Sequence, residues 1–209
     1  VVNAGYVVWC DDANAGATDV AAVLQTYKEG NTWKAELLFA DGKTETVSLK
    51  RNAEWDNNND DTYASGEVPT IDAYSAYENT TEAPEKAIAL VSYTKSGDSY
   101  KLQTIAKNVN PTSYKHVHVA TTNKVKNDRM TSGDTKYIDD NAVVFVRYKS
   151  GTEYKFSVQT GKSMKSWSDK KSFRSVVLSN ESNSINYAKV VLADMGTQSL
   201  PGGSDTTYA

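Results

Sequence analysis

Three stretches of the chain share one spacing of apolar, aromatic and glycine residues, and this spacing limits what the chain can fold into. The clearest stretch runs from Ala142 to Phe156, AVVFVRYKSGTEYKF, where Ala, Phe, Tyr and Gly recur at every third residue before a Tyr-Lys pair. The stretch from Ala21 has the same spacing, and the stretch from Ala87 has it with one extra residue before the glycine. Apolar runs around a short polar segment with glycine are typical of a β-hairpin with a bulged turn or a turn of three to five residues. The three stretches therefore predict repeated hairpins.

Further strand signals occur outside these stretches. Asp41-Gly42 lies between two alternating runs and is a strong hairpin signal, so residues 21–49 are predicted to form a three-stranded meander. Residues 114–121, YKHVHVAT, alternate as a strand does, and residues 175–178 and 185–193 are predicted to be the last strands. Residues 162–171 are expected to form a basic loop.

The length and composition indicate the fold class and the division of the chain into subdomains. A chain of 209 residues can bury one large β core or two of about 100 residues each. Its 13 Tyr and 4 Trp, against 4 Phe, suit thin β layers crossed by half-buried tyrosines. We expect an all-β fold with little helix, made of two small β-barrel or β-sandwich subdomains built from hairpins. The expected ranges are 1–110 with an acidic insertion at 52–86, 111–196, and 197–209 as a linker to a following unit.

Charge, cysteine content and hydropathy argue against several classes of function. The net charge of −3 and the isoelectric point near 5.5 provide no overall positive field for nucleic acid. Cys10 is the single cysteine, so neither a disulfide nor a cysteine-based zinc site can form within the chain. No apolar run approaches the roughly 18 residues of a membrane span, so membrane insertion is not expected.

Four segments together resemble a known family. They are the strand pair at 37–49, the hairpin and Thr-Gly-Lys turn at 140–162, the late strand at 187–193 and the Thr-Tyr-Ala at 207–209. Their order and texture resemble the non-anchoring, β-rich repeat region of S-layer-type bacterial cell-surface proteins, which carry S-layer homology domains elsewhere in the chain. No motif of those helical anchoring modules is found here, so no binding residue of the family is assigned.

The resemblance implies a location, a role and partners. It implies a structural or display segment of a secreted, cell-wall-attached bacterial protein that is extracellular and not an enzyme. The partners that it implies are a cell-wall polymer or neighbouring copies of the surface protein. The alternative function is a surface binding module for a glycan or another extracellular ligand. No cofactor is expected apart from calcium.

The candidate binding residues form a basic group around an aromatic side chain. Lys162, Lys165 and Lys170 surround Trp167, and such a group suits an anionic wall polymer or the acidic stretch of a neighbouring copy. An exposed indole can also stack on a sugar. A solvated basic loop is the simpler interpretation.

The candidate metal site is a calcium loop in the acidic insertion. Counted from Asp56 as position 1, Asn58, Asp60, the Thr62 carbonyl and Glu67 fall at positions 3, 5, 7 and 12, which are oxygen-ligand positions of a calcium loop. However, an aspartate stands where the sharp turn requires glycine, and no helix is predicted on either side. A solvated acidic loop is the alternative.

The two histidines, His116 and His118, lie two residues apart and are expected to project from one face of a strand. Such a pair can hold zinc or copper where a third ligand converges, and Asp128 or Asp134 could supply one. Two partly exposed strand residues are the simpler interpretation. No G-x-S-x-G elbow accompanies them, so a serine hydrolase is not expected.

Overall fold

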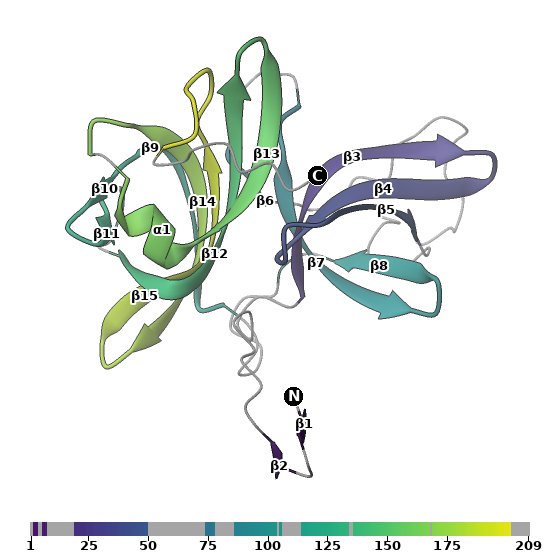
Figure 1. The fold of residues 1–209 in the computed structure, drawn as a ribbon, viewed down its shortest axis with the longest axis horizontal. Coiled ribbons are helices and arrows are strands. Elements are labelled where there is room, and N and C mark those ends of the chain that lie inside the picture. The colour runs from purple at the N-terminus through teal and green to yellow at the C-terminus, as the bar shows by residue number, and fades with distance from the viewer. Residues whose placement is uncertain are drawn as a thin grey trace.

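The chain folds into β-sheets, as the sequence predicts. A computed structural model describes residues 2–3, 6–7, 19–49, 74–77, 86–103, 105, 114–133, 136–167 and 169–201. These residues form two large sheets that lie side by side, a separate ribbon of β1 (Val2–Asn3) and β2 (Tyr6–Val7), and one short helix, α1 (Gly161–Lys165) (Figure 1). The all-β fold class is thus confirmed for the described part of the chain.

The first large sheet closes into a five-stranded barrel. Its strands follow the order β3-β4-β5-β8-β7, and β7 pairs back onto β3 to complete the ring. β5 and β8 run parallel, whereas the other neighbours in the ring run antiparallel. A short strand, β6, pairs antiparallel with the first residues of β7. The bounds are β3 (Val20–Glu29), β4 (Thr32–Phe39), β5 (Thr44–Leu49), β6 (Tyr74–Ser75), β7 (Ala89–Ser96) and β8 (Ser99–Gln103).

The second large sheet is strongly curled. Its order is β10-β11-β12-β15-β14-β9, and β13 pairs with the far part of β12. β12 and β15 run parallel, and the other neighbours run antiparallel. The bounds are β9 (His116–Asn123), β10 (Val125–Lys126), β11 (Arg129–Met130), β12 (Lys136–Ser150), β13 (Glu153–Thr160), β14 (Phe173–Ser182) and β15 (Ile185–Asp194).

The two sheets share one connectivity. β9 and β10 stand at opposite ends of the strand order but are separated by Lys124 alone, so they act as one bent strand. Counted in this way, both units have the ring order first-second-third-fifth-fourth with the third and fifth strands parallel. This is a Greek-key plan of the kind found in small barrels such as the OB-fold. In both units an insertion follows the third strand: residues 50–88 in the barrel, and β13 with α1 in the curled sheet.

The three predicted hairpins are present, with tighter turns than expected. They are β3–β4, β7–β8 and β12–β13, and each has a two-residue loop. The first loop residue is Gly30, Gly97 or Gly151, at φ of 59°, 61° and 62°. Glycine at the first loop position with positive φ is the type II′ hairpin turn, whose twist matches that of the strands. The prediction of a bulged or three-to-five-residue turn is therefore wrong for these three.

The turn at Asp41-Gly42 is the longer kind. The Gly42 amide donates to the Phe39 carbonyl at 2.9 Å, and Gly42 adopts a φ of 86°. The Lys43 amide donates to Asp41 Oδ1 at 3.0 Å, which helps to lower the pKa of Asp41. The predicted meander at 21–49 is thus confirmed as β3, β4 and β5.

The core that joins the two sheets contains apolar side chains from both. Leu38 and Leu90 of the barrel pack in one cluster with Phe145, Leu178 and Leu192 of the curled sheet, and each is at most 2 % exposed. Each sheet also has an apolar cluster of its own, one inside the curled sheet and one inside the barrel. The barrel and the curled sheet therefore pack together through a shared apolar layer.

Two expected loops contain additional structure. The region predicted as a basic loop, 162–171, begins within α1, whose N-cap Thr160 accepts a hydrogen bond from the Ser163 amide at 3.2 Å. Residues 197–201 fall in the expected linker, yet the Lys149 amide donates to the Gln198 carbonyl at 2.9 Å and Leu200 packs on the core of the curled sheet. The described part of this segment is thus attached to the second unit.

Candidate functional site

A buried ion pair lies where the curled sheet meets the barrel. Arg147 of β12 and Asp194 of β15 are register partners on neighbouring parallel strands. Their side chains are 0 % and 2 % exposed, and Arg147 Nη1 donates to both carboxylate oxygens, at 2.9 and 3.2 Å. Both residues follow the alternation of the shared core, because Phe145 and Leu192 lie two positions before them. The pair therefore lies at the edge of the apolar layer that joins the sheets.

The guanidinium of Arg147 also contacts the segment that enters the barrel. Arg147 Nε donates to the carbonyl oxygen of Lys86 at 2.8 Å, and Lys86 precedes β7 in the chain. The guanidinium carbon lies 3.9 Å from the centre of the Tyr154 ring on β13. A buried arginine with a carboxylate, a carbonyl and an aromatic face is held in one orientation, because its planar fork matches each of them.

Tyr77 and Arg174 extend this cluster toward the residues next to β6. Burial raises the pKa of Tyr77 to about 12, helped by the charge of Asp194 and a hydrogen bond to its carboxylate. Arg174 of β14 is the register partner of Asp194 on the other side. Its guanidinium lies 4.7 Å from the centre of the Tyr77 ring, and its Nη1 is 3.5 Å from the Ala76 carbonyl oxygen. We call Tyr77, Arg147, Arg174 and Asp194 the charged knot.

The chemistry of the charged knot suits a structural role, holding the two units together, better than a catalytic role. A tyrosine with a raised pKa keeps its proton at neutral pH and is a poor base. The carboxylate of Asp194 accepts from Arg147 and also from the Gly196 amide at 2.8 Å, so several donors neutralise it. The knot connects residues 76, 77 and 86 of the first unit to three strands of the second.

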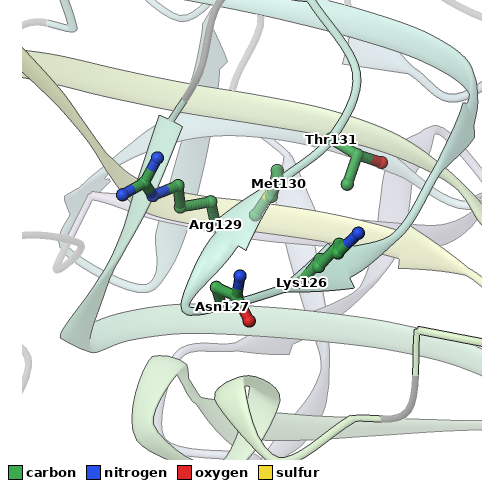
Figure 2. Close-up of a pocket in the computed structure, with 5 residues that line it drawn as sticks. All are labelled: Lys126, Asn127, Arg129, Met130 and Thr131. Carbon is green, nitrogen blue, oxygen red and sulfur yellow. The ribbon is translucent and has the colours of Figure 1, made fainter.

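An open pocket lies at the β10–β11 hairpin (Figure 2). It has a volume of about 300 Å³ and is lined by Lys126, Asn127, Arg129, Met130 and Thr131. Figure 2 shows the side chains of Lys126 and Arg129 extending away from each other on the two strands. The Arg129 guanidinium lies 4.4 Å from the centre of the Tyr137 ring, whose own centre is 6.1 Å from that of Tyr187. Two cations therefore line the pocket, and one of them, Arg129, stacks on the Tyr137 ring.

The candidate binding residue Trp167 lies in the core. The residue is 5 % exposed. Its ring packs edge-on against Phe173 with the ring centres 5.4 Å apart, and Nε1 donates to Gln159 Oε1 at 3.1 Å. The geometry places Trp167 beneath α1 with Met164 and leaves no open indole face for a sugar.

The three candidate lysines have different surroundings. Lys165 pairs with Asp140 at 2.5 Å, and this hydrogen bond raises the pKa of Lys165. Lys162 and Lys170 are exposed. A binding role for the three lysines stays a prediction.

The candidate calcium residues lie outside the part of the chain that the structure describes; they are Asp56, Asn58, Asp60, Thr62 and Glu67. Among the described residues, no group of three His, Cys, Asp or Glu side chains is placed to hold a metal ion. Calcium binding by the acidic insertion stays a prediction.

The two histidines occupy β9 as the sequence predicts. His116 is exposed, whereas His118 is partly buried and its ring lies close to Gly133. Asp128 stands in the β10–β11 turn with a φ of 62°. Within the described ranges, no helix is long and apolar enough to span a membrane.

The charged knot was missed in the sequence, although a signal for it exists. Arg147 stands inside the apolar run AVVFVRY, and Asp194 closes the apolar run VVLAD. A charge within a strand that is otherwise buried needs a partner of opposite sign, because charged residues are almost never fully buried alone.

Comparison with models of protein families, with curated proteins and with solved structures finds no match for the chain.

Proposed function

We propose that the chain is a structural or display segment of a secreted, cell-wall-attached bacterial surface protein, without catalysis. The observation that supports this most directly is the shared apolar layer between the two sheets, sealed at its edge by the charged knot. Such packing favours one stiff body of two units over a pair of loosely linked domains. Stiffness is what a scaffold on a cell surface requires.

The location and partners rest on the sequence resemblance to S-layer-type proteins. On this proposal the segment faces the outside of the cell and contacts a wall polymer or neighbouring copies of the same protein. The net charge of −3 agrees with a solvated surface segment and offers no attraction to nucleic acid.

Cell-surface labelling tests the proposal. An antibody raised against the purified segment should label intact cells of the source organism, and brief protease treatment of intact cells should remove the signal. A cytosolic marker protein serves as the control for lysis. Recovery of the parent protein in the cytosolic fraction, with no label on intact cells, would contradict the proposal.

A second candidate function, binding of an anionic extracellular glycan, is favoured by the pocket at the β10–β11 hairpin. Lys126 and Arg129 line the pocket and provide positive charge, and the Arg129 guanidinium lies over the Tyr137 ring. Arginine recognises carboxylate and phosphate groups through its fork of donors.

Pull-down on purified anionic wall polymer tests this alternative. Binding that saturates and falls at least tenfold in Lys126→Ala/Arg129→Ala would favour it. The matched control is Lys28→Ala/Lys43→Ala, which removes two exposed charges from the barrel. Equal retention of both double variants would exclude a role for the pocket.

A further inference from the structure

One row of side chains crosses three strands of the curled sheet near the starts of β12 and β15. Lys136 of β12 is the register partner of Asn186 on the parallel strand β15. Asn186 is in turn the register partner of Glu181 on the antiparallel strand β14. Register partners on adjacent strands project to the same face, with their Cβ atoms about 4.5–5.5 Å apart. An amine, a carboxamide and a carboxylate therefore stand next to one another in this order.

This row belongs to the inner face of the curled sheet. Ile138 and Ala188 lie two residues beyond Lys136 and Asn186, and both are part of the cluster that fills the inside of the curl. Since strand side chains repeat their face every second residue, Lys136 and Asn186 point to the same inside. Lys136 is 4 % exposed.

The amide of Asn186 has an unsatisfied polar atom at this place. Its Oδ1 is buried and has no hydrogen-bond partner among the described residues. A buried carbonyl oxygen without a donor costs about 1–3 kcal/mol, so an ordinary structural asparagine is expected to avoid it. A lysine amine in its deprotonated form is a nucleophile.

We propose that Lys136 and Asn186 join in an intramolecular isopeptide bond between β12 and β15. Lys136 Nζ attacks Asn186 Cγ, a new carbon–nitrogen bond forms, and the bond from Cγ to the amide nitrogen Nδ2 breaks. The lysine nitrogen gives up a proton, the departing Nδ2 group takes one, and ammonia leaves. No oxidant or further reactant is needed.

Glu181 is placed to carry that proton. Because it stands opposite Asn186, its carboxylate can accept the proton from the lysine nitrogen and pass it to the departing ammonia. Lys115 holds one oxygen of this carboxylate, Oε2, in an ion pair. The pair lowers the pKa of Glu181, mainly through the hydrogen bond, and so keeps Glu181 ionised.

The inference does not depend on the proposed function, because it follows from the strand register, the burial of Lys136 and the buried amide oxygen of Asn186. Intact-mass spectrometry of the purified full chain tests it. A completed bond removes one ammonia, so the expected mass is about 17 Da below the mass of the sequence. Protease mapping should then recover the peptides that contain residues 136 and 186 as one linked species.

The outcomes are distinct. A mass equal to that of the sequence overturns the inference, and so does a lower mass whose linked peptides contain another pair of residues. Lys136→Met and Asn186→Ala should each have the full mass calculated from their own sequence, without the loss of ammonia. Asn180→Ala, a neighbouring exchange on β14, should keep the mass loss as the matched control.

Substitutions at the exposed residues Glu181 and Lys115 test the role of Glu181 as proton carrier without altering the packing of the core. Glu181→Gln should leave a large share of the chain without the bond, whereas Lys115→Met should keep the bond because Glu181 remains. Complete bond formation in Glu181→Gln overturns the role of Glu181. The presence or absence of the linked peptides in the unaltered chain still tests whether the isopeptide bond forms.

Discussion

Arg147 illustrates why a charge can be retained inside an apolar sheet. Taking an ion pair out of water is expensive, and the attraction between the partners repays that cost only when the geometry and further hydrogen bonds are good. Arg147 meets this condition with two contacts to Asp194, one to the Lys86 carbonyl and the Tyr154 ring. We therefore expect the pair to fix how the units meet more than it adds to stability.

Removal of one partner should be far more harmful than removal of both. Arg147→Met leaves the Asp194 carboxylate buried without its main cation, and we expect it to cost about 3–5 kcal/mol of unfolding free energy. Arg147→Met/Asp194→Leu removes both charges and should recover most of that loss. Urea unfolding of the three chains measures the difference. A double variant as unstable as the single one would contradict this account.

Tyr77 should make the protein sensitive to alkaline pH. Its folded pKa of about 12 lies above the value of 10.0 for a free tyrosine, so the unfolded chain loses the proton first as the pH rises. The contribution of Tyr77 is therefore fully present below pH 10.0 and is lost between pH 10.0 and about 12. Tyr77→Phe should lose less stability across this interval than the unaltered chain, as thermal melts at several pH values would show. Tyr114→Phe is a useful comparison, because burial also raises the pKa of Tyr114 to about 12.

At the residue scale, the sequence shows which residues are unusual but not which of them meet. Arg147 and Asp194 are 47 residues apart, and the parallel pairing of β12 with β15 brings them together. That pairing has no local signal, because the strands are joined through β13, α1 and β14. The sequence makes Trp167 a candidate binding residue within a basic loop, yet Trp167 is buried while Lys162 and Lys170 are exposed.

The hairpin glycines carry the clearest requirement at the scale of elements. Gly151 has a φ of 62°, and a Cβ added there would meet nothing within 4 Å, so the constraint is backbone conformation and not space. Gly151→Ala should therefore cost about 1 kcal/mol, because alanine tolerates positive φ poorly. Gly151→Asn should cost less, and Thr152→Ala serves as the control at the next position. Thermal melts measure all three, and an unchanged melting temperature for Gly151→Ala would contradict the assignment.

Gly161 has the opposite requirement. A Cβ there would lie 1.8 Å from the backbone oxygen of Asp139 and 3.0 Å from the Cβ of Ala142, so α1 packs directly on β12. Gly161→Ala must displace the helix or the strand, and we expect it to cost at least the roughly 1–3 kcal/mol of an overpacked site. Lys162→Ala, at the exposed next position, should be nearly neutral. Chemical unfolding of both variants measures the contrast, and a stable Gly161→Ala would show that the helix packs less closely.

Hairpins could be predicted from the sequence because their signals are local. Apolar runs, tyrosines and a glycine between them are enough to locate β3–β4, β7–β8 and β12–β13. The turn length was wrong because Gly-Asn, Gly-Asp and Gly-Thr suit two-residue loops as well as longer ones. Helix α1 was missed because five residues are too short for a periodic pattern, although Thr160 is a good N-cap residue.

At the scale of the whole molecule, the repeat lies in the connectivity and not in the hairpin spacing. The hairpin β3–β4 supplies the first and second strands of its ring, whereas β12–β13 starts from the third strand and continues into the insertion. The similar spacing of the two stretches thus reflects the general chemistry of hairpins. The shared ring order, with parallel third and fifth strands, emerges only from pairings distant in sequence.

The shared apolar layer should make the two units unfold together. Leu37 is 0 % exposed and belongs to a cluster made entirely of barrel residues. Leu37→Ala should cost about 2–5 kcal/mol, as large-to-small exchanges in a core do. If the layer couples the units, the exchange of backbone hydrogens that requires global unfolding should accelerate equally in β4 and in β14, which lies in the other sheet. Hydrogen exchange followed by mass spectrometry measures both strands in one experiment. Acceleration confined to β4 would show instead that the barrel unfolds alone. The contacts of the charged knot would then break before the two cores unfold.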